Sequence, residues 1–113
     1  MRARARHKPG VMNKLEARYA ELLEERKRKG EIVWYAFEGM KFVLTDRKPR
    51  TTYTPDFIVQ LADGILEAHE VKGHWEPSAR IKIKCAASKF PIEFIAVKPR
   101  TKKDGGGWKV EEF

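Results

Sequence analysis

The sequence predicts an α/β (α+β) fold in which helices flank a mixed central β-sheet. Residues 13–29 carry apolar side chains at helical spacing. Residues 57–71 hold two short runs rich in Ile, Val and Phe, split by a turn that contains glycine. A second helical stretch then precedes another apolar run at residues 92–97. The expected element order is therefore α-β-β-β-(β)-α-β.

The first expected element is a helix that begins at Asn13 and ends near Lys29. Glu16 lies three residues after Asn13, which is the spacing of a capping box. Gly30 is a typical residue at the end of a helix. The stripe expected to be buried consists of Leu15, Tyr19, Leu22 and Leu23.

Two strands are expected next, at residues 32–37 and 42–45. The turn at residues 38–41 would pair them as antiparallel neighbours. Residues 46–52, which read D-R-K-P-R-T-T, are predicted to form a basic loop that leads directly into Asp56. Basic side chains of this loop are therefore expected near Asp56.

The next expected element is a β-hairpin of residues 57–61 and 65–71. A three-residue loop with Gly64 in the left-handed conformation would set Leu61 opposite Ile65. His69 is expected to be a structural histidine with its hydrogen bonds satisfied. The side chains expected in the core on the same face are Phe57, Val59, Leu61, Ile65 and Val71.

Counting outward from this turn sets Asp56 opposite Glu70, with Lys72 on the same side of the hairpin. Directly opposed strand residues have Cβ atoms about 4.5–5.5 Å apart, so two carboxylates there repel each other unless a cation lies between them. Mg²⁺ prefers such oxygen ligands together with water and a substrate phosphate. Lys72 is placed to orient an attacking water or to neutralise charge. These residues suit hydrolysis of a phosphodiester.

A second helix is expected from Ser78, as its N-cap, to about Lys89. The alternation at residues 81–84 also fits a strand. Residues 92–97 are expected to form a central strand. Residues 108–113 are expected to form a short edge strand or a dimer contact.

The charge balance favours a polyanionic partner. The 113 residues include 24 Lys and Arg against 16 Asp and Glu, a formal net charge of +8. Nucleic acid fits this charge better than a membrane, because the sequence contains no apolar run long enough to span a bilayer and no lipidation signal. A solubilising surface charge is the alternative. A single cysteine, Cys85, allows no internal disulfide, and no zinc-type Cys/His spacing occurs, so we expect a cytoplasmic protein.

Residues 1–12 are predicted to be a basic arm that is disordered when free, and residues 13–113 a single domain. The arm would follow phosphates or a groove when bound to nucleic acid, and a frayed terminus is the alternative. The candidate contacts in the arm are Arg2, Arg4, Arg6 and Lys8.

Pro55-Asp56 followed by Glu70-Val71-Lys72 resembles the signature of the PD-(D/E)xK nuclease superfamily. This resemblance implies a restriction-endonuclease-like core. It also implies that Asp56, Glu70 and the backbone carbonyl of Val71 bind Mg²⁺ or Mn²⁺, while Lys72 assists the attacking water. An edge hairpin with solvated charges is the alternative.

Many members of this superfamily carry a further acid on the helix before the sheet. Asn-Lys-Leu-Glu at residues 13–16 resembles this position and implies that Glu16 is a catalytic and metal-binding residue. Helix capping alone is the alternative role.

Further candidate contacts to nucleic acid lie outside the signature. They are Arg47, Lys48 and Arg50 in the basic loop, Trp75 after the hairpin, and Arg80, Lys82 and Lys84 in the second helix. A charged exposed turn is the alternative for the loop, and a loop anchor is the alternative for Trp75.

Within the superfamily, the spacing of Glu16, Asp56, Glu70 and Lys72 resembles that of phage-type, endonuclease I-like Holliday junction resolvases. The function implied is a metal-dependent DNA endonuclease that is selective for branched DNA and acts as a homodimer in a bacterial or phage-infected cytoplasm. The alternatives are a nicking or flap nuclease, a nuclease directed by a partner protein, and a catalytically silent nucleic-acid-binding module. A small RNA-binding protein would fit the charge but leave the opposed acids unexplained.

Overall fold

The computed structural model describes residues 10–113 and confirms the α+β class. Among these residues no helix is both long and apolar enough to cross a membrane. The helices are α1 (Lys14–Arg28), α2 (Pro77–Lys89) and the short 3₁₀ helix η1 (Lys102–Asp104). The strands are β1 (Ile32–Phe37), β2 (Phe42–Val43), β3 (Thr52–Tyr53), β4 (Phe57–Leu61), β5 (Leu66–Val71), β6 (Glu93–Pro99) and β7 (Trp108–Glu112).

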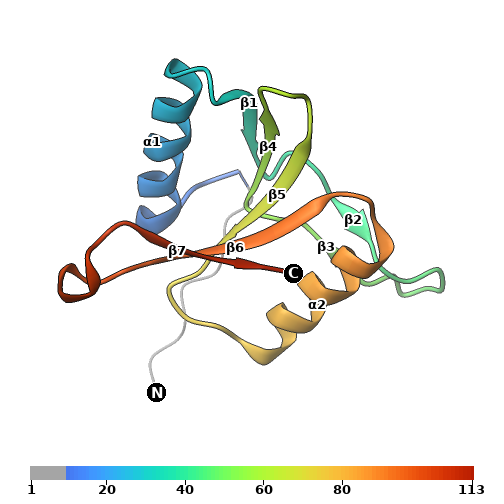
Figure 1. Cartoon of the computed structure of the whole chain (residues 1–113). Helices are drawn as coiled ribbons and strands as arrows, with labels where there is room; N and C mark the ends of the chain where they lie inside the picture. The colour runs from blue at the N-terminus through green and yellow to red at the C-terminus, as the bar shows by residue number, and fades with distance from the viewer. Residues whose placement is uncertain (1–9) are drawn as a thin grey trace.

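A mixed sheet forms the centre of the fold (Figure 1). In the described part of the chain its strand order is β1-β4-β5-β6-β7. β5 and β6 run parallel, which requires the crossover through α2, and the other neighbours are antiparallel. β7 is an edge strand, as the sequence predicts. β2 and β3 pair with each other in a separate small sheet.

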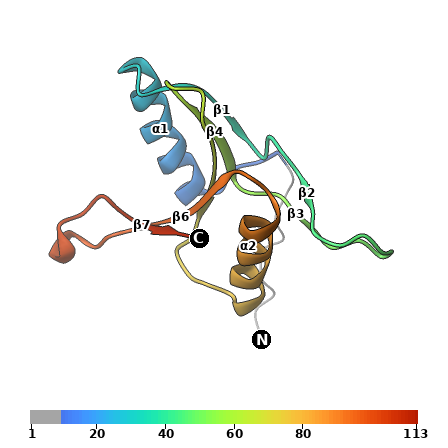
Figure 2. The same ribbon diagram turned by 45° about the vertical axis from the view of Figure 1, so that its right-hand side comes forward.

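The two faces of the central sheet pack against different elements (Figure 2). α1 covers one face, and α2 covers the other together with β2 and β3. The core on the α1 side contains Tyr19, Leu23, Ile32, Phe57, Val59, Val71 and Val97. The core on the α2 side contains Phe42, Tyr53, Ile58, Ala68, Ile83, Ala86 and Phe94. Both faces of β4 are therefore buried where it begins.

The predicted start of the first helix is confirmed. The side chain of Asn13 accepts a hydrogen bond from the backbone N–H of Glu16 at 2.8 Å, and Glu16 Oε1 accepts one from the N–H of Asn13 at 2.9 Å. These reciprocal bonds satisfy two of the donors that a helix N-terminus leaves free. The helix ends at Arg28, and Gly30 follows with a φ of 79°.

The predicted pairing of residues 32–37 with residues 42–45 is wrong. β1 pairs with β4, and Glu38 extends that ladder by donating its backbone N–H to the carbonyl of Asp56 at 2.7 Å. β2 has only two strand residues, whereas β4 has five, four of them apolar, which pair along β1. The longer pairing buries more backbone and side chain, so the chain leaves the sheet at Glu38, whose φ is 50°.

Two smaller predictions also fail. The N-cap of α2 is Glu76, not Ser78, because Pro77 lacks a free N–H and suits the first helical position. Ile65 is 49% exposed because it lies in the turn before β5, not in the strand. The helix itself and the burial of Ile83 and Ala86 are as expected.

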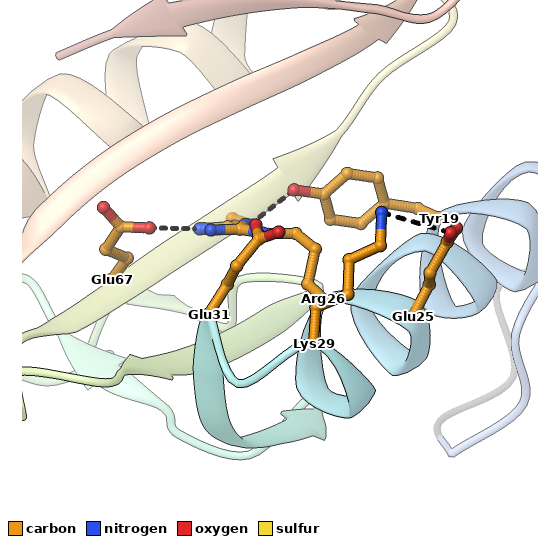
Figure 3. A network of polar contacts seen from close by, with 7 residues as sticks. Tyr19, Glu25, Arg26, Lys29, Glu31 and Glu67 are labelled. Carbon is orange, nitrogen blue, oxygen red and sulfur yellow. Dashed lines mark hydrogen bonds and ion pairs between the residues drawn. The ribbon is translucent and has the colours of Figure 1, made fainter.

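A buried polar chain joins α1 to β5. The Tyr19 hydroxyl lies 2.6 Å from His69 Nδ1, and His69 Nε2 lies 2.8 Å from Glu67 Oε1 (Figure 3). Burial raises the pKa of Tyr19, so its hydroxyl keeps the proton. The hydrogen bond to His69 lowers the pKa of Glu67, which is therefore ionised. Both ring nitrogens of His69 are thus hydrogen-bonded, one to Tyr19 and one to Glu67, and His69 is a structural histidine as predicted.

Tyr19→Phe should lower the free energy of unfolding by about 1–3 kcal/mol, because it leaves the fully buried His69 Nδ1 without a partner. Urea denaturation followed by circular dichroism measures this change. Tyr35→Phe is the matched control. Its hydroxyl donates to the half-buried Glu24, to which water has access, so the loss should stay below about 1 kcal/mol. Equal losses in the two variants would contradict the role of the buried chain.

Candidate functional site

The turn between β4 and β5 sets the register of the site. The backbone N–H of Leu61 donates to the carbonyl of Ile65 at 2.8 Å, and Gly64 has a φ of 93°. The paired residues run from Gln60 and Leu66 out to Phe57 and His69. The next pair outward is Asp56 and Glu70, so the predicted register and the left-handed Gly64 are confirmed.

Asp56 and Glu70 each accept a hydrogen bond from the backbone of the opposite arm of the hairpin. Asp56 Oδ2 accepts a hydrogen bond from the N–H of Val71 at 2.8 Å, and Glu70 Oε1 accepts one from the N–H of Asp56 at 3.3 Å. Glu70 Oε1 also accepts a hydrogen bond from the Tyr53 hydroxyl at 2.9 Å. These bonds leave little freedom to Glu70, which is 6% exposed. Burial, and then the charge of Glu70, raise the pKa of Tyr53, so the hydroxyl remains a donor.

Lys72 lies beside the acids, as the alternation predicts. Its Nζ is 3.0 Å from Glu70 Oε2, and its side chain is 26% exposed. The backbone N–H of Lys72 donates to the carbonyl of Val97 at 2.9 Å, so β6 fixes the main chain at this position. The ammonium also lies 5.9 Å from the centre of the Trp75 ring.

Glu16 reaches Asp56 from the first turn of α1. Glu16 is 5% exposed, and its carboxylate lies close enough to Asp56 to contribute to the raised pKa of that carboxyl group. Three acidic side chains from α1 and the β4–β5 hairpin therefore meet at the open end of the hairpin.

Glu16, Asp56 and Lys72 line a cleft with a volume of about 850 Å³, whereas Glu70 lines a second groove beside Tyr53 and Lys82. Sequence reasoning placed Glu16, Asp56, Val71 and Lys72 at the cleft but missed Lys41 and Glu38, which also line it, and Tyr53, which holds Glu70. The signal available for Tyr53 was its position three residues before Asp56. The full lining is Asn13, Leu15, Glu16, Glu38, Lys41, Thr54, Asp56, Val71, Lys72, Gly73 and His74.

The acidic cluster shifts the titration of Asp56. Burial makes the largest contribution and the charge of Glu70 the next, and together with Glu16 they raise the pKa of Asp56 from 3.8 to about 8. The hydrogen bond from Val71 opposes this shift but does not cancel it. Asp56 thus keeps its proton near neutral pH. A cation bound at the same position would relieve the repulsion between the carboxylates in place of that proton.

The oxygen atoms of the cleft fit a hard divalent cation such as Mg²⁺. Such an ion needs one or two carboxylates and completes its shell with water and phosphate oxygens. Asp56 and Glu16 face the cleft, and Val71 lies on its wall. Glu70 Oε2 is engaged by Lys72 and becomes a ligand only if the lysine moves. No group of three His, Cys, Asp or Glu side chains in residues 10–113 is arranged to hold a metal by itself.

The basic loop is not near the cleft. Arg47, Lys48 and Arg50 are exposed in the loop between β2 and β3, which extends away from the central sheet (Figure 2). None of the three is among the described residues that line the cleft. The pairing of β2 with β3 carries the loop outward, a feature that the sequence did not predict. Its contact with phosphates stays a prediction.

The second helix distributes its basic residues over two sides. The Arg80 guanidinium pairs with the Glu111 carboxylate through two hydrogen bonds, one of them 3.0 Å long. Its Cζ also lies 4.9 Å from the centre of the Trp75 ring. Lys82 lines a shallow groove that includes Tyr53 and Glu70, and Lys84 is exposed. Arg80 and Trp75 thus anchor β7, whereas Lys82 is free to meet a ligand beside the site.

Four candidate contacts, Arg2, Arg4, Arg6 and Lys8, lie outside the described residues. The described chain begins at Gly10, whose N–H donates to Glu38 Oε1 at 2.7 Å.

A scan against protein-family models finds no matching family, and searches of curated proteins and of solved structures find no match to this chain. The functional conclusion therefore rests on the residues of the site.

Asp56→Asn should change how stability depends on pH in the presence of a chelator. An acid whose pKa is raised in the folded state does not lower the stability at pH values below its pKa in the unfolded state, 3.8 for Asp56. It then destabilises the fold increasingly up to the folded value of about 8, by about 1.4 kcal/mol per pKa unit. Asparagine keeps an oxygen for the Val71 N–H but has no charge to bury.

Wild-type protein should therefore lose stability relative to Asp56→Asn as the pH rises from about 5 to about 8. Urea denaturation in this range measures the difference. Asp63→Asn, in the exposed hairpin turn, is the control and should follow the wild type. Parallel curves for wild type and Asp56→Asn would contradict the proposed burial of an unneutralised charge.

Proposed function

We propose that this chain is a metal-dependent endonuclease that hydrolyses phosphodiester bonds in DNA, built on a restriction-endonuclease-like core. One observation carries the proposal: Asp56 and Glu70 are opposed at the open end of a hairpin, and Lys72 and Glu16 contact them beside the cleft. A structural role alone does not favour this arrangement, because it buries acids whose repulsion costs stability.

Asp56, Glu16, Glu70 and the Val71 carbonyl are the residues that would hold Mg²⁺ or Mn²⁺. When bound, the ion supplies positive charge for the phosphate oxygens and lowers the pKa of a coordinated water. Asp56, whose pKa is raised to about 8, would give up its proton to a bound cation, so binding should be coupled to proton release. Tyr53 donates to Glu70 Oε1 and so helps to hold the carboxylate with its other oxygen, Oε2, beside Lys72.

Lys72 supplies the mobile positive charge. It is paired with Glu70 Oε2 in the free protein. Once a cation takes over that oxygen, the ammonium can donate hydrogen bonds to the attacking water and to the phosphate on which charge develops. The fixed backbone N–H of Lys72 keeps the side chain at the cleft during this exchange.

DNA is the expected substrate because of the charge around the cleft. Lys41 lies on the cleft wall and Lys82 on the adjoining groove, and the chain carries a net charge of +8. Phosphate contacts of this kind give affinity without reading bases. The expected substrate within this class is branched DNA recognised by its shape, and symmetrical cleavage of a four-way junction would require a homodimer with two sites.

The Lys72–Glu70 ion pair supports a second candidate, a catalytically silent nucleic-acid-binding module. This pair neutralises one acid without a metal, as a site that has lost its chemistry would. Such a protein would bind DNA through its basic surface, with Asp56 remaining protonated near neutral pH.

Cleavage of labelled four-way junction, flap, single-stranded and linear duplex DNA tests the proposal, with Mg²⁺, Mn²⁺ or a chelator. Wild type should cut the junction only with metal, and Lys72→Met should reduce the rate by about 100-fold or more. Lys27→Met is the matched control, because Lys27 is exposed near the far end of α1, and it should cut at the wild-type rate.

Each outcome separates the candidates. Metal-dependent cutting of flaps or single strands would keep the nuclease and change its substrate. Salt-sensitive binding without cutting, and with no Mg²⁺-dependent rise in melting temperature, would favour the silent module. Normal cutting by Lys72→Met would show that the site has been assigned wrongly.

A further inference from the structure

The hairpin that joins β6 to β7 extends beyond the central sheet in both views (Figures 1 and 2). We call residues 98–109 the basic wing. It carries one acid, Asp104, and that carboxylate is used locally, because its Oδ2 accepts a hydrogen bond from the Thr101 hydroxyl at 3.0 Å. Its five basic side chains are all exposed: Lys98, Arg100, Lys102, Lys103 and Lys109.

The base of the wing is fixed to the candidate site. The carbonyl of Val97, one residue before the wing, accepts the backbone N–H of Lys72. At the other end of the wing, the Trp108 ring packs on Tyr19 with centroids 5.1 Å apart, and the Arg18 guanidinium lies 5.5 Å from its centre. Tyr19 is one helical turn from Glu16. The direction of the wing is thus set by the same elements that hold Lys72 and Glu16.

The end of the wing allows the sugar-phosphate backbone of a nucleic acid to approach closely. Gly105, Gly106 and Gly107 follow η1 with φ values of 98°, 68° and 71°, which disfavour residues with a Cβ. Nothing lies within 4 Å of where a Cβ would be on any of them. The end of the wing therefore presents main chain, flanked by Lys102 and Lys103, with no bulky side chain to keep a ligand away.

The length of the wing matches a short stretch of duplex. Extended residues rise about 3.3 Å each and the 3₁₀ residues of η1 about 2 Å each, so Lys102 and Lys103 lie at most roughly 15 to 17 Å from Val97. That distance is the rise of about four or five base pairs of B-DNA, at 3.4 Å per base pair. A duplex with one phosphate in the cleft would then have phosphates of the same arm beside the wing.

We propose that the basic wing is a second DNA-binding element, which contacts phosphates of the duplex arm about four or five base pairs from the bond held in the cleft. This inference rests on the proposed function for its substrate but not on cleavage itself. The wing holds the arm in one direction across the site, and its contacts are independent of sequence. Asp56, Glu70 and Lys72 do the chemistry, and the wing supplies orientation.

The test compares two double variants that each remove two positive charges. Lys102→Gln/Lys103→Gln changes the wing, and Lys27→Gln/Arg28→Gln changes exposed residues at the far end of α1. Binding to a fluorescent duplex of about 20 base pairs is measured by anisotropy with chelator, between about 50 and 200 mM salt. The melting temperature of each variant checks that it is folded.

The wing variant should bind about 10-fold more weakly at about 100 mM salt, and its plot of log K against log salt should be less steep by about 1 to 2. The control should bind within about twofold of wild type with an unchanged slope. An unchanged slope in the wing variant, or an equal change in the control, would overturn the inference. The binding assay contains chelator, so its result does not depend on metal-dependent cutting. If the wild type binds DNA through the wing but does not cleave DNA when Mg²⁺ or Mn²⁺ is added, the proposed nuclease activity is wrong and the role of the wing is still supported.

Discussion

The register of the β4–β5 hairpin is the constraint on which the candidate site depends. Side chains alternate between faces, so a slip of one residue would turn Asp56 and Glu70 toward the α1 core and bring Phe57 to the cleft. The turn at Gly64 resists this slip, since its φ of 93° is costly for most other residues. The N–H of Val71 then holds Asp56 at the far end. A turn at one end of the hairpin thereby determines which side chains meet at the other end.

The position of α1 depends on a second, buried interaction. Tyr19 contacts His69, which directly precedes Glu70 in the chain, while Glu16 stands one turn away from Tyr19 on the same helix. The helix is thus attached to the strand that carries one acid and delivers another acid to the cleft. Because His69 and Glu70 point to opposite faces of β5, the polar chain under α1 and the acidic cluster beside the cleft are both held by the same segment of β5.

Local signals made much of this arrangement predictable. The capping box at Asn13, the turn at Gly64 and the alternation around Glu70 each depend on a few neighbouring residues, and each is confirmed. The pairing of β1 with β4 could not be predicted in this way, because it depends on competition between partners distant in sequence. The same non-local choice carries residues 46–50 outward and brings Lys41 to the cleft wall. The restriction-endonuclease-like core and the roles of the acids stay proposals.

Glu16 has a consequence for how this cleft is probed by mutation. One carboxylate both closes the capping box and touches Asp56, so Glu16→Ala would unsettle the first turn of α1 at the same time as it empties the cleft wall. Any loss that it caused would combine two separate defects. Glu16→Gln keeps an oxygen for the N–H of Asn13 while removing the charge. Comparing the two variants therefore separates the contribution of Glu16 to the start of α1 from the contribution of its charge to the cleft.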